Sequence, residues 1–413
     1  MTTATALPLY AVLPFVAMLL AIAVCPLWVP HWWERNLNKF LVSCVLGLPV
    51  LLLYLAHEPL ALARMGEEYV SFILLLAGLY SISGGVLLRG DLEATPLTNT
   101  AFLTLGSLLA SFVGTTGASM VLIRPLLQTN RERTRVKHTV IFFIFLVSNI
   151  GGMLTPLGDP PLFLGYLRGV PFAWTFRLWL PWLAMVGTLL LVYFIWDSIQ
   201  HAREPLAALR RDRARLEPLR IRGVTNGLYV LGVVLAVAFL REPIREIVIV
   251  ALAALSLWRT PHEIRRLNGF TAYPMVEVAV LFFGIFLTMI PALELLRLRG
   301  GELGVREPWQ FFWAAGTLSS FLDNAPTYLV FLALGQGLRV ADEVVGVTHA
   351  ILAGISVGAV SMGANTYIGN APNFMVKSIA EQAGVKMPSF FGYMAYSGGI
   401  LIPLFVAATF LFF

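Results

Sequence analysis

Apolar runs long enough to cross a lipid bilayer follow one another from residue 8 to residue 413. Because about 20 apolar residues span the ~30 Å hydrocarbon core as a helix, this pattern argues against a soluble globule. The composition agrees: 58% of the 413 residues are hydrophobic and only 13% are charged, about half the charged share of soluble domains. The alternating ten-residue segments typical of an outer-membrane barrel do not recur. We therefore predict an all-α polytopic membrane protein.

About ten transmembrane helices are expected, in two halves. The predicted spans cover residues 8–30, 37–57, 68–88, 139–168 and 174–197, then 224–241, 244–259, 273–296, 344–380 and 391–413. We interpret 8–30 as the first span and not as a cleaved signal, since it lacks a basic start and a cleavage site. The first half is residues 1–197, a basic, amphipathic or solvated linker covers 198–223, and the second half is residues 224–413.

Two further apolar runs, 99–127 and 308–336, are divided by polar residues. Each arm is expected to be too short to cross the bilayer, so we predict two re-entrant hairpins. Five crossings in each half are an odd number, which would invert the second half relative to the first. Inverted repeats with discontinuous helices are typical of secondary transporters.

Basic clusters set the predicted orientation. The segments 129–138, 198–223 and 259–269 gather Arg and Lys on one side of the predicted spans. The positive-inside rule assigns that side to the cytoplasm, so both termini should face outside. In a membrane protein the net charge of +6 informs topology and gives no indication of nucleic-acid binding.

Polar breaks interrupt both hairpins and two of the spans. The hairpin tips are "SFVGTTGASM" and "TLSSFLDNAPTYLV", and the spans 139–168 and 344–380 are broken by "SNIGGMLTPLGDPPLFLG" and "SMGANTYIGNAPNFMV". Within the broken spans, Gly158-Asp159-Pro160-Pro161 corresponds to Gly369-Asn370-Ala371-Pro372. The match is short, but it recurs some forty residues beyond each hairpin tip, which supports an internal repeat.

Broken backbone at membrane depth is tolerated only where it is buried in protein or lines a wet cavity. The ends of half-helices present carbonyls to cations, and their starts present N–H groups to anions. Four breaks that converge would therefore form an ion and substrate site. Asp159 and Asn324 precede prolines and are predicted N-caps. A carboxylate at this depth usually marks an ion or proton path, so we favour Asp159 and Asp323 as functional acids over simple caps.

The other candidates at the breaks carry amide or hydroxyl oxygens. The amides could coordinate sodium, with turn or cap roles as an equal alternative, whereas the hydroxyls are more often helix-stabilising. The candidate ion- or substrate-binding residues are Thr115, Thr116, Ser148, Asn149, Thr155, Asp159, Asp323, Asn324, Asn365, Thr366 and Asn370. The candidate sodium ligands are Asn149, Asp159, Asp323, Asn324 and Asn365.

Three of these stretches, "SNIGGMLTPLGDPPLFL", "SSFLDNAPTYLV" and "GANTYIGNAPNFMV", resemble motifs of the ion transporter superfamily. This group includes NhaD-type sodium/proton antiporters, ArsB-type arsenite permeases, the melanosomal P protein and citrate-type carboxylate transporters. The resemblance places Asp159 and Asp323 at the positions of the two antiporter aspartates. By the same likeness, the polar sodium-site positions are Ser148, Asn149, Thr155, Asn324 and Asn365.

The resemblance also implies a homodimer, with a scaffold domain and a mobile transport domain in each protomer. Two departures leave the substrate open. The first hairpin tip, "GTTGAS", lacks the Ser-Asn-Thr of the dicarboxylate branch, and Pro-Pro follows Asp159 where NhaD-type antiporters often carry hydroxyls.

Four functions can be compared with these features. A sodium/proton antiporter is favoured, because an acid surrounded by hydrocarbon can alternate between a proton and a metal ion. The alternative is sodium-coupled transport of citrate or another anion, in which sodium must lie between the aspartate and the bound carboxylate. An intramembrane aspartyl protease would use Gly158-Asp159 and Pro291-Ala292-Leu293, but the order of its two aspartates is wrong here. A passive channel has no need for two inverted broken spans.

We thus expect a transporter and not an enzyme, in a bacterial inner membrane. Sodium and protons are the expected coupling or transported ions, and no cofactor is expected. The expected partners are lipid, a small ion or solute and a second copy of the chain, with no nucleic acid.

Overall fold

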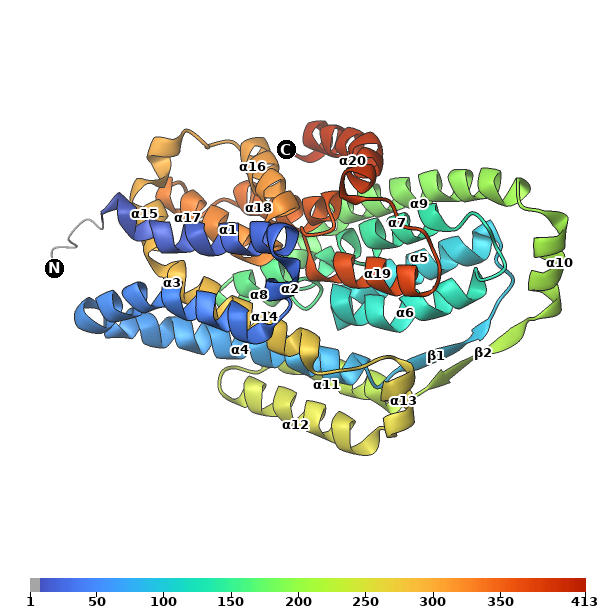
Figure 1. Cartoon of the computed structure of the whole chain (residues 1–413). Helices are drawn as coiled ribbons and strands as arrows, with labels where there is room; N and C mark the ends of the chain where they lie inside the picture. Colours follow the sequence, from blue (N-terminus) through green and yellow to red (C-terminus); the bar gives the residue numbers. More distant parts are fainter. Residues whose placement is uncertain (1–7) are drawn as a thin grey trace.

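The computed structural model describes residues 8–413, which fold almost entirely into helices (Figure 1). The predicted first half therefore begins with seven residues that lie outside the described chain. Its elements are η1 (Leu9–Val12), α1 (Leu13–Trp28), α2 (Pro30–Trp33), α3 (Asn36–His57), α4 (Pro59–Ser83), β1 (Leu87–Asp91), α5 (Pro96–Val113), α6 (Thr115–Thr129), α7 (Lys137–Leu146), η2 (Ile150–Leu154), α8 (Pro160–Leu167), η3 (Phe172–Leu178) and α9 (Trp179–Ala202).

The linker and the second half continue in the same manner. Their elements are α10 (Leu206–Ala214), β2 (Glu217–Arg222), α11 (Thr225–Phe239), α12 (Ile244–Arg259), α13 (His262–Leu267), α14 (Tyr273–Thr288), α15 (Ile290–Arg299), η4 (Gly300–Leu303), α16 (Pro308–Phe321), α17 (Asn324–Gly337), α18 (His349–Met362), η5 (Gly363–Asn365), α19 (Ala371–Gln382) and α20 (Phe390–Phe412). The prediction of an all-α polytopic membrane protein is confirmed.

Within residues 8–413, six helical segments are long and apolar enough to cross a membrane: Leu9–Pro26, Asn36–His57, Pro96–Val113, Lys137–Leu154, Phe172–Ala202 and Phe390–Phe412. A seventh arises if α14 and the following helical segment, bent by 44°, count as one span. The other predicted spans are shorter or more polar. α11 and α12 have 15 and 16 residues, fewer than the ~20 of a full crossing, and α4 carries Arg64, Glu67 and Glu68. Fewer helices thus pass this test than the ten expected.

The helices pack as two groups. In the first helix group (α1–α4 and α11–α15), α3 packs on α14 and α4 packs on α12. In the second helix group (α5–α9 and α16–α20), α16 packs on α18, α5 on α6 and α19 on α6. Figure 1 shows α3, α4, α12 and α14 on one side and α9, α16, α18 and α20 on the other. α17 touches α15 of the first group and α8 of the second.

The second helix group holds the most deeply buried helices. Every residue of α7 from His138 to Leu146 is buried, and residues Ile351 to Met362 of α18 are buried except Ala353. A helix that is apolar on all sides belongs in the centre of a bundle, where no face meets lipid or water. Both of these central helices run directly into the breaks predicted from the sequence.

The two predicted hairpins correspond to helix pairs α5–α6 and α16–α17. Gly114 joins the first pair with a φ of 81°, a left-handed conformation that favours glycine. Leu322 and Asp323 separate the second pair. The expectation that each arm is too short to cross is wrong for α5, whose 18 residues pass the length and composition test. The helix starts at Pro96, earlier than the predicted residue 99, because Thr95 caps it by accepting the N–H of Thr98.

The linker contains an element that the sequence analysis did not predict. α9 continues to Ala202 and α10 follows, in keeping with an amphipathic linker, but β2 then pairs antiparallel with β1. Leu87 lies opposite Arg222 and Arg89 lies opposite Arg220, with an irregularity before Asp91. β2 is exposed along its whole length, so no buried face signals it. These two strands and α10 lie toward one end of the molecule, where β1 packs against α6 (Figure 1).

Candidate functional site

Each broken span closes on its hairpin through the same contact. The hydroxyl of Thr155 donates to the carbonyl of Ser111, and the hydroxyl of Thr366 donates to the carbonyl of Ser320 at 2.5 Å. Both threonines also accept the backbone N–H two residues further on. The two candidate threonines thus satisfy backbone groups that a broken helix leaves free. Their hydroxyls organise the breaks.

Paired glycines allow each break to double back on itself. A Cβ added to Gly158 would lie 2.0 Å from the carbonyl oxygen of Gly152. A Cβ added to Gly369 would lie 2.5 Å from the carbonyl oxygen of Gly363. Real Cβ atoms do not come this close to backbone atoms, so any side chain at these positions would force the two chain segments of the break apart. The correspondence of Gly158-Asp159 with Gly369-Asn370 is therefore structural as well as sequential.

Asp159 lies where all four breaks meet. The residue is 1% exposed. Its Oδ1 accepts the Thr115 hydroxyl at 2.9 Å and the Asn370 amide at 3.1 Å, and its Oδ2 accepts the Asn324 amide at 2.5 Å. Thr115 opens α6 after the first hairpin tip, Asn324 opens α17 after the second, and Asn370 belongs to the second broken span. One carboxylate thus gathers donors from the other three breaks.

Amides join the two broken spans around this carboxylate. The Asn370 amide also lies 3.1 Å from the Ser148 carbonyl and 3.3 Å from Asn149 Oδ1. Asn149 in turn donates to Asn373 Oδ1 at 2.7 Å, and the Ser148 hydroxyl lies 2.9 Å from that of Ser119. Asn373 was not among the predicted site residues. Its position three residues after Asn370, on the same face of the start of α19, is the sequence feature that could have indicated it.

Asp323 plays a different part from Asp159. Its side chain accepts the Ala325 N–H at 3.0 Å, so Asp323 is the N-cap of α17. The prediction that Asn324 is the N-cap is wrong, since Asn324 is the first helical residue and faces Asp159. Asp159 occupies the N-cap position of α8, but its side chain makes no capping hydrogen bond there. The carboxylate is free for the contacts with the other breaks because Pro160 and Pro161 have no N–H and the N–H of Leu162 donates to the main-chain carbonyl of Asp159.

Two amide oxygens at the breaks are left without a donor. Asn324 Oδ1 and Asn365 Oδ1 are buried and accept no hydrogen bond from any residue in the described range 8–413. The nitrogens of the same amides are engaged, Asn324 with Asp159 and Asn365 with the Ser320 hydroxyl at 2.9 Å. A buried amide oxygen without a partner is costly, and amide oxygens suit hard cations. Both residues therefore fit the predicted role of sodium ligand. Thr116 is half-buried beside Thr115.

Helix ends of both polarities surround these residues. α6, α8, α17 and α19 all begin at the breaks, and α5, α7, α16 and α18 end there or directly before them. The helix starts direct the positive end of the helix dipole toward the breaks, and the helix ends direct the negative end there, although α8 opens with Pro160 and Pro161, which have no N–H. Helix ends of both polarities thus lie near Asp159.

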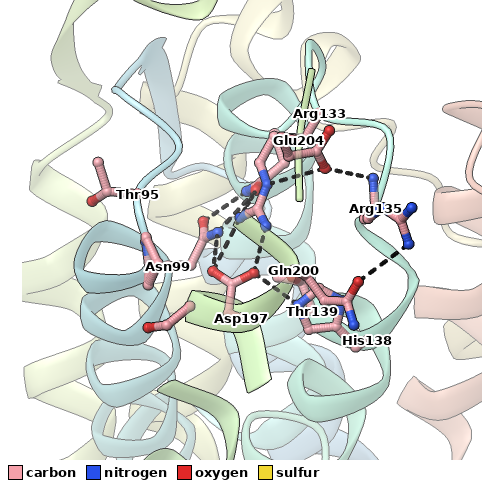
Figure 2. Close-up of polar contacts among 12 residues, drawn as sticks. Thr95, Asn99, Arg133, Arg135, His138, Thr139, Asp197, Gln200 and Glu204 are labelled. Atoms are coloured by element: carbon pink, nitrogen blue, oxygen red, sulfur yellow. Dashed lines mark hydrogen bonds and ion pairs between the residues drawn. The ribbon is translucent and has the colours of Figure 1, made fainter. Parts of the chain in front are cut away.

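A second buried polar network escaped the sequence analysis (Figure 2). Asp197 on α9 accepts two hydrogen bonds from Arg133, at 2.7 and 3.0 Å, and lies 2.7 Å from His138 Nε2. The Asn99 amide adds a contact at 3.2 Å. The side chains of Arg133 and Asp197 are 1% and 0% exposed. This network ties α5, the loop after α6, α7 and α9 together. His138 belongs to it through the contact with Asp197.

The convergent breaks and the helical fold define a class of protein, the polytopic membrane transporters with discontinuous helices. Within that class, a family model described as "Putative citrate transport" matches residues 4–413. The chain therefore belongs to this family, which is part of the ion transporter superfamily. The resemblance read from the motifs is confirmed. No curated protein has a significant sequence match to the chain.

Proposed function

We propose that the protein is a cation-coupled secondary transporter of a small organic anion of the citrate type. Asp159 is the residue that holds the coupling cation or proton. One observation carries this proposal: a fully buried carboxylate receives hydrogen bonds from Thr115, Asn324 and Asn370, which belong to three different breaks. The family to which the chain belongs supports the choice of solute.

Charge explains why transport would be coupled. The described partners of Asp159 are all neutral, so no side-chain cation there balances its charge. A buried carboxylate without a counter-ion is strongly disfavoured, so the site stays empty of an anion until a sodium ion or a proton neutralises Asp159. The unpartnered oxygens of Asn324 and Asn365 are the candidate amide ligands for sodium. The anion then binds only after the cation, which is the condition for symport.

The helix starts around the site supply the anion-binding groups. The starts of α6 and α17 adjoin Asp159 through Thr115 and Asn324. The Thr115 N–H donates to the Gly158 carbonyl and the Ala325 N–H donates to Asp323, so the dipole of each helix, and not these two N–H groups, would attract the anion. A helix start attracts a carboxylate without a basic side chain, which is how secondary transporters commonly hold anionic substrates. In this proposal the cation lies between Asp159 and the solute, so the two negative groups do not meet.

Sodium/proton antiport remains the second candidate. It is favoured by the neutrality of the described contacts around Asp159, because a trivalent anion often takes an Arg or Lys partner. In that case one carboxylate alternates between a proton and sodium, and no solute is needed. An aspartyl protease is a weaker candidate, since Asp323 caps α17 and is not the described partner of Asp159.

Alternating access would move the second helix group against the first. The breaks and Asp159 belong to the second helix group, while the first presents α3, α4, α12 and α14 as a separate packed layer. The two inverted halves, the homodimer, the inner-membrane location and the outward-facing termini expected from the sequence belong to this proposal.

Uptake by proteoliposomes tests it. We expect radiolabelled citrate to accumulate when a sodium or proton gradient is imposed, and accumulation to fall more than about tenfold in Asp159→Asn. Asn keeps the shape and part of the hydrogen bonding, so a fall reports the lost charge. Glu302→Gln, an exposed carboxylate paired with Arg299, is the matched control and should transport normally.

The same vesicles separate the two candidates. A trapped pH dye follows protons when sodium is added without citrate. Sodium-driven proton movement that disappears in Asp159→Asn, with no citrate uptake, would replace the proposal by antiport. Citrate uptake that ignores both gradients would refute coupling.

A further inference from the structure

Three carboxylates meet at the end of the molecule that carries the linker, away from the breaks. Asp91 ends β1, Glu132 lies in the turn after α6, and Asp212 lies on α10. One carboxylate oxygen of each lies within 4.8 Å of those of the other two. Asp91 and Asp212 are 6% and 4% exposed, and the Glu132 side chain is 7% exposed. These residues share no contact with Asp159 and are far from it in the chain.

In each of the three carboxylates, only one oxygen contacts a donor or a basic group of the described chain. Asp212 Oδ2 accepts the Ala94 N–H at 2.9 Å, Asp91 Oδ2 is 3.5 Å from the Gln128 amide, and Glu132 Oε1 is 3.5 Å from Arg215. The second oxygens, Asp91 Oδ1, Glu132 Oε2 and Asp212 Oδ1, are buried and have no hydrogen-bond partner anywhere in residues 8–413. Three buried acceptors left free in one place are a costly arrangement unless something binds them.

The electrostatics of the cluster are unfavourable without a cation. Burial raises the pKa of Asp91 and of Asp212, and the negative charge of Glu132 raises both further. Arg215 is the basic residue paired with Glu132, and its side chain is 63% exposed, so its charge is strongly screened. The neighbouring Arg213 is bound to Glu93 at 2.7 Å. Arg133 partly offsets the charge of Asp212, but it is itself paired with Asp197 and Glu204.

We infer that Asp91, Glu132 and Asp212 form a site for a hard divalent cation, Ca²⁺ or Mg²⁺. The donor set is all oxygen, the choice of these ions and not of zinc or copper. Two ligands of one Ca²⁺ at about 2.4 Å cannot be more than about 4.8 Å apart, and the three oxygens meet that limit. Water would complete the coordination, as is usual for both ions.

The bound ion would act as a clamp. It would join the end of β1, the turn that follows α6 and the linker helix α10, three segments more than 30 positions apart in the sequence. The site lies outside the transport breaks, so it does not depend on what the protein carries. Its predicted effect is on the stability of this end of the protein.

Direct binding tests the inference on the full chain purified in detergent and stripped with EDTA. Equilibrium dialysis with ⁴⁵Ca²⁺ should find about one ion per chain, with affinity at least about tenfold lower in Asp212→Asn and Asp91→Asn. Asn at 212 can still accept the Ala94 N–H, which favours normal folding. Glu93→Gln, next to the site in sequence but paired with Arg213, should bind as the wild type does, and so should Asp159→Asn.

Thermal unfolding gives a second readout that does not rely on any one variant. Saturating Ca²⁺ or Mg²⁺ should raise the wild-type Tm by about 3 °C or more and leave that of Glu132→Gln unchanged. The stripped Glu132→Gln protein should be at least as stable as the stripped wild type, since one repulsive charge is gone. Absence of binding at about 1 mM free Ca²⁺ and Mg²⁺, or binding that survives both Asp91→Asn and Asp212→Asn, would overturn the inference.

Discussion

Replacement of Asp197 by Asn should destabilise the protein more than any change to a surface charge. The carboxylate of Asp197 is fully buried and pairs with Arg133 through two hydrogen bonds, at 2.7 and 3.0 Å. His138 and Asn99 complete its shell. Asn has nearly the same volume, so the substitution leaves no cavity. Its effect is to remove the paired hydrogen bonds to a carboxylate from the buried Arg133 guanidinium, whose remaining counter-ion is Glu204 at 3.8 Å.

The magnitude follows from that geometry. Removal of one partner from a buried ion pair costs about 3–5 kcal/mol, because the remaining charge stays desolvated. The longer contact of Arg133 with Glu204 places the expected loss near the lower end of that range. The Arg133→Gln variant should lose a similar amount. The double variant should lose less stability than the sum of the two single losses, by at least about 1 kcal/mol. Each single variant leaves one charge buried without its partner, whereas the double variant contains neither charge.

Equilibrium unfolding of the purified protein in mixed detergent micelles, followed by tryptophan fluorescence, measures these free energies. Glu263→Gln breaks the exposed pair with Arg222 and serves as the control, with no measurable change expected. The reasoning is refuted if Asp197→Asn loses less than about 1 kcal/mol, or if the two single losses add within about 0.5 kcal/mol.

Two further predictions concern pH and backbone packing. Burial alone would raise the pKa of Glu204, but hydrogen bonds from the hydroxyl and N–H of Thr134 and the N–H of Arg135 hold it below its ordinary value of 4.5. Its contribution to stability is therefore complete above pH 4.5 and is lost as the pH falls through the lowered pKa, so Glu204→Gln should flatten the acid side of a Tm profile recorded from about pH 7 to pH 3. An unchanged acid limb in that variant would contradict this assignment. Gly158→Ala should lower the Tm and abolish transport because its Cβ meets the backbone at 2.0 Å, whereas Gly399→Ala, with nothing within 4 Å, should leave both intact.

The fold could be predicted largely from the positions of glycine, proline and polar residues within apolar runs. The stretch that contains Gly158, Asp159 and Pro160 can be neither lipid-exposed nor a regular helix, so its burial at a break follows from the sequence alone. The same logic located the second broken span at Asn370 and both hairpin tips. That these four breaks meet at one carboxylate was expected from the repeat, and the contacts of Asp159 show it.

What could not be predicted depends on partners distant in the chain. Asp197 follows an apolar run and precedes a charged linker, so by itself it resembles an interfacial residue. Its burial depends on its pairing with Arg133, which lies 64 positions away in the chain. β2 was missed for the same reason, since an exposed strand carries no apolar pattern and exists because β1 is its neighbour. Whether Asp323 or Asn324 caps α17 depends on the residue at which the helix begins, and a motif resemblance does not define that residue.

The pairing of β1 with β2 restricts how the two bodies of the protein can shift. β1 connects α4 to α5, and β2 connects α10 to α11, so both strands are crossings between the first helix group and the second. Because the two strands are hydrogen-bonded side by side, neither connection can move independently of the other. Together they form a short double tether that permits tilting but resists sliding at that end. The third connection between the groups, from α15 through η4 to α16, has no such paired strand. In the proposed mechanism, relative sliding should therefore be smallest at the end that carries β1 and β2.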